Sequence, residues 1–399
     1  MSHPDQHSHV PAIVTAAVLG ASSLTVMANA TIAPALPGLR DHFADTPGIE
    51  TLAGLVVTLP SLFVVLAAGP IGVLADRYDK RPMLVLAMLV YALGGASGLF
   101  VDSIAAMLVG RVFLGLGVAG TMTIASAYIG TLWHGAARDR FTGFQVAAMN
   151  FGGIVFMTTG GLLAGMHWRA PFGIYAFSVP LMILAWVALK RVSGRVPTGP
   201  TGEVDVEGGF PWGAFLWVGP FAMVSMIAFY ALPTRLPFIL DERGLAGPLL
   251  TGMILSTGTL VSIPGALLYG RIRRFAEPLQ IMAVAFFAMG VGIALVAMAT
   301  SVWMTVLGVA VAGAPLGVMF PNFIAFFMSL VPMRMRGRAG GLFTMSVFGG
   351  QFLSPLVSAP LIGAFRLGGG MLAVAVLPLL AAAFIVLAGG TRPPRPAEV

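Results

Sequence analysis

Long apolar stretches without a charged residue follow one another along this chain. Since a helix needs about 20 mostly apolar residues to cross a bilayer, each stretch predicts a membrane-spanning helix. The run 278–333 is too long for one span and is interrupted at Thr300 and Ser301, so it predicts two. An all-α membrane protein of 12 transmembrane helices is therefore expected. The stretches free of Asp, Glu, Lys and Arg are 10–39, 51–75, 82–101, 112–133, 141–166, 170–189, 208–234, 244–270, 278–333, 339–365 and 367–391.

The composition agrees with a chain that lies in a membrane. Hydrophobic residues make up 58% and charged residues 9%, against roughly 45–50% apolar content in soluble domains. The sequence contains no cysteine, which excludes disulfides and thiol chemistry. The first nine residues carry no basic cluster, so the segment does not resemble a signal peptide and the first helix is expected to stay.

The basic residues predict how the chain is oriented. Short cytoplasmic loops carry an excess of Lys and Arg, and a cytoplasmic N-terminus places 16 of the 22 bases inside. Both termini are therefore expected in the cytoplasm of a bacterial inner membrane, and this asymmetry accounts for the net charge of +7. The lipid bilayer is the expected partner and nucleic acid is not. The 16 bases are Arg77, Lys80, Arg81, Arg138, Arg140, Lys190, Arg191, Arg195, Arg271, Arg273, Arg274, Arg334, Arg336, Arg338, Arg392 and Arg395.

An internal repeat with an offset of 198 residues predicts two related halves. The Gly- and Pro-rich segment 191–210 suits a cytoplasmic linker between an N-terminal six-helix bundle over 1–190 and a C-terminal one over 211–399. These two bundles are expected to be pseudo-symmetric. The matching pairs are Gly72 and Gly270, Gly115 and Gly313, Arg138 and Arg336, Arg140 and Arg338, Gly143 and Gly341, Gly152 and Gly350, and Gly165 and Gly363.

The segment Gly72–Met83, GVLADRYDKRPM, packs two acids and three bases between two apolar stretches. It resembles the loop between the second and third helices of the major facilitator superfamily (MFS), written roughly G-x-L-A-D-R-x-G-R-[KR]. Other segments resemble motifs of this family, in particular its drug:proton antiporter-type branch with 12 helices, so the resemblance covers nearly the whole chain. They are Arg111–Gly120, His167–Phe172, Tyr230–Phe238 and Gly350–Pro355.

Two positions depart from the family pattern. Asp79 stands where the loop motif normally has Gly, and the segment Phe156–Gly161 lacks the Gly-Pro of the antiporter motif. The second departure counts against export and antiport.

The resemblance implies a conformational latch at the charged loop. Asp76 would contact the start of the helix predicted over 339–365, near Gly340 and Gly341, because helix N-termini favour anions. Gly72 belongs to the same motif. Arg77 and Arg81 would hold carboxylates or carbonyls nearby, and Asp139 is a candidate partner. The alternative is that these charges only fix topology and solvate a turn.

Two arginines are candidates for substrate binding or coupling. Arg111 is the only base deep inside a predicted span, where a charge costs roughly 2.5–3.5 kcal/mol on insertion scales. It could anchor substrate, or carbonyls of neighbouring helices could satisfy it. Arg235, in Pro233–Pro237, could act as a gate or attract an anionic substrate. Alternatively, its side chain could reach the lipid headgroups.

Uncharged polar side chains in the predicted spans could line a substrate cavity or serve as hydrogen-bonding links between helices. All 15 acids fall in loops or at helix ends, so a cavity without an acid should prefer neutral, anionic or amphipathic substrates. The polar candidates are Asn29, Thr58, Gln145, Asn150, Tyr230, Thr257, Asn322 and Gln351.

These observations predict a secondary active transporter that works by alternating access as a monomer. Its expected partners are a small molecule and protons, and export of an amphipathic, neutral or anionic compound is favoured. Uptake of an organic anion, sugar or metal chelate is the alternative. The sequence shows no hydrolase, zinc-protease or Walker motif, so no enzyme, cofactor or metal is expected; a non-transporting receptor or intramembrane enzyme on the same fold is the alternative from another class.

Overall fold

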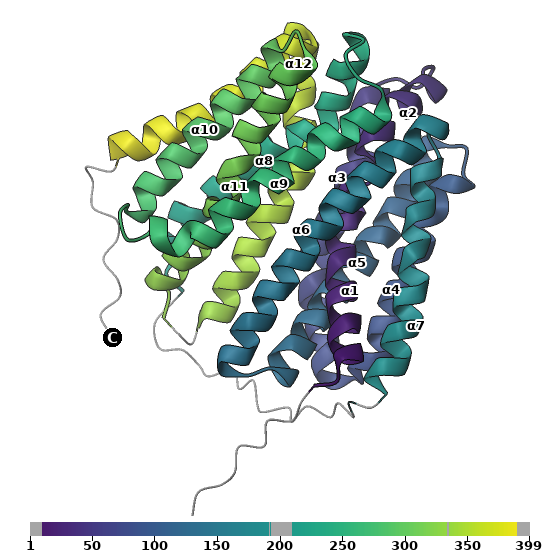
Figure 1. Cartoon of the computed structure of the whole chain (residues 1–399), viewed down its shortest axis with the longest axis vertical. Coiled ribbons are helices and arrows are strands. Elements are labelled where there is room, and N and C mark those ends of the chain that lie inside the picture. Colours follow the sequence, from purple (N-terminus) through teal and green to yellow (C-terminus); the bar gives the residue numbers. More distant parts are fainter. Residues whose placement is uncertain (1–9, 191, 193–209, 333–334, 389–399) are drawn as a thin grey trace, which may run out of the picture.

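The computed structural model describes residues 10–190, 192, 210–332 and 335–388. In these ranges the chain is built from helices joined by short turns (Figure 1). The elements are α1 (Ala12–Ala30), η1 (Ala33–Ala35), α2 (Leu36–His42), α3 (Ile49–Arg77), α4 (Lys80–Ala96), η2 (Ser97–Leu99), α5 (Ile104–Leu132), α6 (Gly135–Met166), η3 (Ala170–Phe177), α7 (Ser178–Leu189), α8 (Trp212–Glu242), α9 (Pro248–Ile272), α10 (Pro278–Met298), α11 (Val302–Leu330) and α12 (Arg336–Ala388).

Eleven helices among the described residues are long and apolar enough to cross a membrane. The longest, α12, has 53 residues, about 80 Å at 1.5 Å per residue, whereas the hydrocarbon core is about 30 Å thick. It is broken at Arg366, whose φ of 59° and ψ of 176° are not helical. This break coincides with the boundary between the predicted spans 339–365 and 367–391.

The long apolar run 278–333 also divides as the sequence predicts. Helix α10 ends at Met298, and α11 begins at Val302. Ser301 caps the new helix, because its side chain accepts a hydrogen bond from the backbone N–H of Met304 at 3.3 Å. A hydroxyl that satisfies a free N–H at a helix start is a common N-terminal signal.

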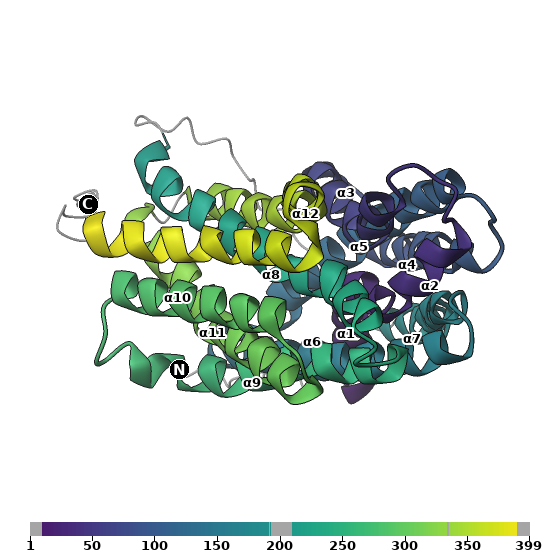
Figure 2. The ribbon, with the colours of Figure 1, turned by 90° about the horizontal axis from the view of Figure 1, so that it is seen from above.

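The buried apolar residues form two cores, one for each half of the chain. One core gathers residues between Val14 and Leu189, together with Phe238. The other gathers residues between Phe210 and Ile385, together with Ala33. Figure 2 shows the halves side by side, α1 to α7 in purple to teal and α8 to α12 in teal to yellow. The boundaries at 190 and 210 stay predictions, and most of the linker lies outside the described residues.

The 198-residue repeat is visible in the way the helices cross. Gly94 of α4 faces α5 so closely that an added Cβ atom would lie 2.8 Å from the carbonyl oxygen of Gly110. In the other half, Gly292 of α10 faces α11, and an added Cβ would lie 2.6 Å from the carbonyl oxygen of Gly308. Both members of the second pair lie 198 positions after the first. Glycine therefore permits the same close backbone crossing in each half.

We name the two ends of the bundle after a residue at each. At one end, here called the Asp76 end, α3 and α7 terminate and α4 and α8 begin (Figure 1). At the other, called the Asp241 end, α2 lies beside the end of α8 and the start of α9.

Candidate functional site at the seams between the halves

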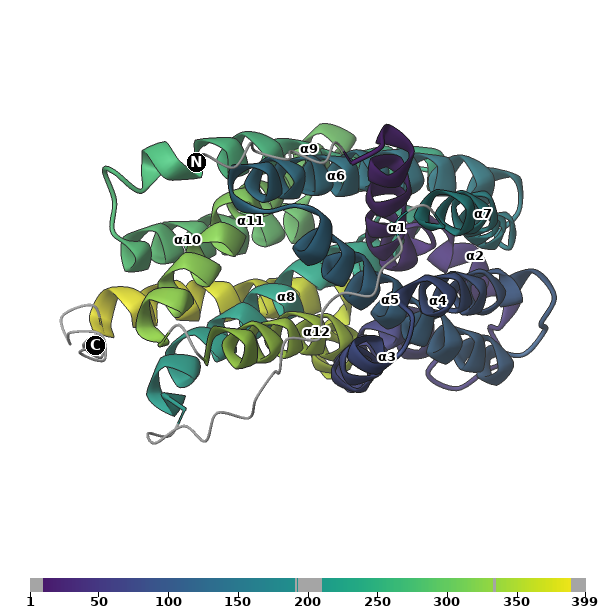
Figure 3. The ribbon, with the colours of Figure 1, turned by 90° about the horizontal axis from the view of Figure 1, so that it is seen from below.

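Two helix pairs make the most extensive contacts between the halves, and we call them seams. Figure 3 shows α12 beside α3 and α9 beside α6. In the α3–α12 seam, the hydroxyl of Ser61 donates to Oε1 of Gln351 at 2.8 Å. In the α6–α9 seam, the hydroxyls of Thr158 and Ser256 lie 3.2 Å apart. Ser256 also lies within hydrogen-bonding distance of the carbonyl of Ile154, at 3.4 Å. Polar contacts therefore cross from half to half in both seams.

The seams are two copies of one contact. An added Cβ at Gly54 of α3 would lie 2.8 Å from Cβ of Pro355, and one at Gly252 of α9 would lie 2.5 Å from the carbonyl oxygen of Met157. Gly252 lies 198 positions after Gly54, and Pro355 lies 198 positions after Met157. A pseudo-two-fold relation between halves explains why both seams close on a glycine.

Arg235 of α8 holds the α3–α12 seam at the Asp241 end. Its side chain is 1% exposed. Nε donates to the hydroxyl of Ser358 at 3.0 Å and Nη2 to the carbonyl of Pro355 at 3.1 Å, both on α12. Nη1 donates to the carbonyl of Glu50 on α3, at 3.3 Å. The guanidinium is thus bound between three helices instead of reaching the lipid headgroups, and it lines a cavity of about 430 Å³.

A second link joins the halves at the same end. Nη2 of Arg40, on the short helix α2, lies 2.9 Å from a carboxylate oxygen of Asp241 at the end of α8. The guanidinium also lies 5.4 Å from the centre of the Phe238 ring. Because both charged groups are partly exposed, the pair contributes about 1 kcal/mol or less.

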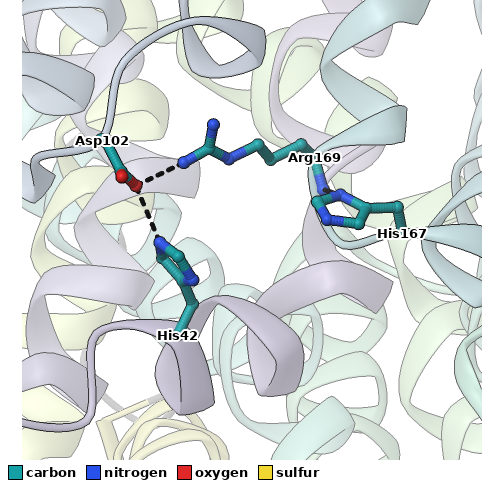
Figure 4. A network of polar contacts seen from close by, with 4 residues as sticks. All are labelled: His42, Asp102, His167 and Arg169. Atoms are coloured by element: carbon teal, nitrogen blue, oxygen red, sulfur yellow. Dashed lines mark hydrogen bonds and ion pairs between the residues drawn. The ribbon is translucent and has the colours of Figure 1, made fainter.

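Helix α2 is fixed within its own half by a polar network (Figure 4). Nε2 of His42 lies 2.8 Å from a carboxylate oxygen of Asp102, to which Nη2 of Arg169 also binds. The backbone N–H of Arg169 donates to Nδ1 of His167 at 3.1 Å. The hydrogen bond with His42, together with the charge of Arg169, lowers the pKa of Asp102 below its ordinary value. The network positions Arg40, two residues before His42, to meet Asp241.

The predicted latch residues at the Asp76 end do not meet. Asp76 is exposed and takes part in none of the ion pairs found in the described ranges. An added Cβ at Gly340 would meet only Cε of Met328, at 4.0 Å, and one at Gly341 would meet nothing within 4 Å. Among the described residues, only Met328 therefore comes near the start of α12 at these glycines.

The other latch candidates make contacts inside the N-terminal half. Arg81 donates from Nε to the carbonyl of Trp186 at 2.9 Å and stacks on its ring. Asp79, where the family motif has Gly, caps α4 by accepting from the N–H of Arg81. Gly72 faces Thr123. Arg77 is exposed, and the side chain of Asp139 lies outside the described part.

Arg111 lies inside the N-terminal half, away from the seams. It is fully buried, and Nη2 donates to the carbonyls of Gly94 and Gly95 at 3.2 and 2.6 Å. These carbonyls belong to the last turn of α4, where the helix dipole favours a positive charge. The rings of Phe172 and Tyr175 lie 5.0 and 5.1 Å from the guanidinium carbon. The carbonyls thus bind Nη2, whereas Nε and Nη1 of Arg111 are buried without a hydrogen-bond partner among the described residues.

The uncharged polar candidates are spread over separate contacts. Gln145 donates to Ser22 within the N-terminal half at 3.0 Å. Asn322 donates to the carbonyl of Pro278 and accepts from Tyr269, which links α9, α10 and α11. Gln351 bonds across a seam, to Ser61. Asn150, Tyr230 and Thr257 are half-buried, Thr58 is buried and bonds the Gly54 carbonyl, and the side chain of Asn29 lies outside the described part.

Arg235 and Gln351 are among the predicted candidates, but several other residues that join the halves are not. Ser61, Thr158 and Ser256 are small hydroxyl residues of a kind that recurs in many of the predicted spans, so no local signal distinguishes them. Arg40 and Asp241 carry opposite charges at the same end of the molecule, which is a weak signal. Only the three-dimensional arrangement makes each of them a partner of the opposite half.

The family of this chain follows from a comparison with family models. The model of the Major Facilitator Superfamily matches residues 18–355. The chain belongs to this family of transporters. The repeat, the membrane-capable helices and the motif at Gly72 agree with that assignment.

Relatives within the family transport different compounds. The chain is 27% identical over 298 residues to the class C tetracycline resistance protein of Escherichia coli, covering 72% of this chain and 74% of that protein. It is 24% identical over 369 residues to the sialic acid transporter NanX of E. coli, covering 87% and 86%. It is 29% identical over 153 residues to the bacillibactin exporter of Bacillus subtilis, covering 37% of each.

Solved structures of MFS transporters share the fold. A bacterial homologue of the human lysosomal transporter Spinster superposes with a TM-score of 0.78 at 17% identity, over 100% of both chains. The E. coli xylose transporter XylE superposes with a TM-score of 0.72 at 14% identity, over 94% of this chain and 95% of that one. The MFS fold is thus retained at low sequence identity.

Proposed function

We propose that this MFS protein is a secondary active transporter that exposes one central cavity to each side of the membrane in turn. The observation that carries the proposal is the difference between its two ends. At the Asp241 end, Arg235 and the pair of Arg40 with Asp241 join the halves. At the Asp76 end, Asp76 is exposed, and no described atom lies within 4 Å of an added Cβ at Gly341. A protein closed at one end and open at the other is in one state of an alternating-access cycle.

The Asp76 end is proposed to face the cytoplasm. It carries the charged segment around Arg77, Lys80 and Arg81 and the bases near the starts of α10 and α12. This distribution agrees with the rule that cytoplasmic loops carry an excess of Lys and Arg. In this orientation the state is inward-open and both termini are cytoplasmic. The break at Arg366 then gives α12 two crossings and the chain twelve.

Proton-coupled export of a small amphipathic, neutral or anionic compound is the proposed activity. The absence of an acid from the middle of the predicted spans argues against organic cations. The tetracycline resistance proteins and the bacillibactin exporter among the relatives support export. Uptake is the second candidate, because the sialic acid transporter matches a longer part of the chain than the bacillibactin exporter does.

Transport by full-length protein in proteoliposomes with an imposed pH gradient tests the proposal. Ligands are first selected from a panel of anionic and amphipathic compounds by thermal stabilisation. Accumulation that follows the gradient supports proton coupling, and its direction separates export from uptake. A compound that stabilises the protein but never crosses the membrane, with either gradient, would support a receptor instead.

A designed disulfide tests alternating access itself. The chain has no cysteine, so Thr158→Cys with Ser256→Cys introduces one pair, at hydroxyls 3.2 Å apart and within reach of a disulfide. Oxidation should lock the α6–α9 seam and abolish transport, and reduction should restore it. Thr158→Cys alone is the matched control. Full transport by the oxidised pair would contradict the mechanism.

A further inference from the structure

An apolar groove lies on the surface of the N-terminal half, and its lining residues belong to α1, α6 and η3. It has a volume of about 680 Å³ and is walled by α6 and η3, with α1 between them. Figures 1 and 3 place α1 between α6 and α7 at the margin of the bundle, so the groove faces the surroundings of the protein. Phe151 on one wall is 70% exposed and Phe177 on the other is 49% exposed.

The groove has the length of one leaflet of a bilayer. Its α6 wall runs from Ala148 to Thr159, which is about 17 Å at 1.5 Å per residue. The hydrocarbon core of a bilayer is about 30 Å thick, so one leaflet contributes about half of it. The wall begins eight residues after Arg140 and stops seven before Met166, the two ends of the membrane-capable part of α6, so the groove lies at the depth of acyl chains.

The lining offers an occupant only apolar surface. Of the residues that the structure describes, none with a charge lines the groove, and the two with a hydroxyl are Ser23 and Thr159. Ser23 donates to the carbonyl of Gly20 at 2.8 Å, and Thr159 donates to that of Val155 at 2.7 Å. Both hydroxyl protons are therefore used within their own helices. An occupant needs no hydrogen-bonding group to match this surface.

We propose that the groove between α1, α6 and η3 binds one acyl chain of a bilayer phospholipid. The chain would fill an indentation that the protein's own side chains leave open, which restores packing contacts to the groove walls. Space is available at Gly173, where an added Cβ would meet nothing within 4 Å. The inference rests on the position of these helices in a membrane and not on the proposed transport.

The bound acyl chain acts on a helix that belongs to a seam. Helix α6 presents Gly152 to α1, while Thr158 and Gly161 of the same helix contact α9 of the other half. An occupied groove therefore supports α6 on one side while α9 packs on another. Lipid composition would then influence the α6–α9 seam through this helix.

Photo-crosslinking tests the site. The full-length protein is placed in nanodiscs of phosphatidylcholine that carries a diazirine midway along one acyl chain, and cross-linked residues are identified by mass spectrometry. We expect labelling of 148–159 and 173–177 to exceed several-fold that of the exposed apolar face of α12 at Leu380, Phe384 and Leu387. Equal labelling of both surfaces would overturn the proposal.

Filling the groove provides the second arm. Gly173→Leu and Thr159→Phe each place a bulky side chain in it from a different wall, and both should reduce this labelling several-fold. Gly165→Leu is the control, because Gly165 is exposed on the same helix but does not line the groove. Elution from a size-exclusion column and a cooperative thermal unfolding transition verify that each variant folds. A folded filling variant with unchanged labelling would refute the site, and loss of labelling on adding a transported compound would assign the groove to substrate instead of lipid.

Discussion

Arg235 on α8 donates a hydrogen bond to the backbone carbonyl of Glu50 on α3, so a guanidinium buried in one half binds the other half directly. The same group also binds Ser358 and Pro355 on α12. One side chain therefore joins three helices at the Asp241 end. Because it binds mainly backbone atoms, the link depends on the positions of α3 and α12 more than on their side chains.

Replacing Arg235 should loosen the Asp241 end. Arg235→Met keeps the length of the side chain but removes its donors, and should lower the free energy of unfolding by about 1.5–3 kcal/mol, the range for hydrogen bonds to charged groups. A single cysteine at Thr51, which lines the adjacent cavity, should react faster with a membrane-impermeant maleimide. Arg274→Met, at an exposed position of the other end, is the control. An unchanged reaction rate at Thr51→Cys would show that Arg235 does not control access.

Replacing Arg366 with glycine should stabilise the protein. Its φ of 59° lies in the region that L-residues rarely adopt, at a cost of order 1–3 kcal/mol, whereas glycine adopts such values readily. Arg366→Gly should therefore raise the midpoint of thermal unfolding. Arg366→Ala retains the strain while it removes the same side chain, so it should lie below the glycine variant. Equal midpoints for the two variants would indicate that the strained backbone contributes little.

The Asp102 network should be sensitive to acid. Because the pKa of Asp102 is lower in the folded protein than its ordinary value, the ionised carboxylate contributes stability above that ordinary value, about 3.9. This contribution is lost as the pH falls through the lowered value. Thermal unfolding between neutral and strongly acidic pH should thus show a steeper acid loss for the wild type than for Asp102→Asn. Parallel curves would contradict the linkage.

Asp76 should matter for turnover and little for the stability of the state seen here. It is exposed and has no ion pair among the described residues, so Asp76→Asn should leave thermal unfolding nearly unchanged. If the carboxylate binds the start of α12 in the opposite state, the substitution should slow transport, by tenfold for each 1.4 kcal/mol lost. Normal transport by a well-expressed variant would reject the latch and leave Asp76 as a topological charge.

The helices could be predicted from the sequence because hydrocarbon excludes charge. A single charged residue, Arg366, separates two apolar runs and also marks the break in α12. Thr300 and Ser301 divide α10 from α11 in the same way. Both signals lie within a few consecutive residues, so they can be recognised without knowledge of the three-dimensional structure.

The site was less predictable because its contacts join residues far apart in the chain. The sequence around Arg235 is compatible both with a position at the lipid headgroups and with burial. Only its contacts with α3 and α12 in the structure decide for burial. The sequence alone is likewise compatible with Arg111 as a substrate anchor. The structure shows instead that it binds two carbonyls at the end of α4. Ser61 becomes informative only opposite Gln351, 290 positions later.

The repeated glycine crossing has a consequence for how the protein moves. Backbones that touch at Gly94 with Gly110, and again at Gly292 with Gly308, leave little freedom for those helix pairs to slide. Each half is then expected to move as a rigid body, so the contacts that rearrange are those between the halves, among them Gly54 with Pro355 and Gly252 with Met157. A bulky residue at Gly54 or Gly252 should hinder this rearrangement without unfolding either half.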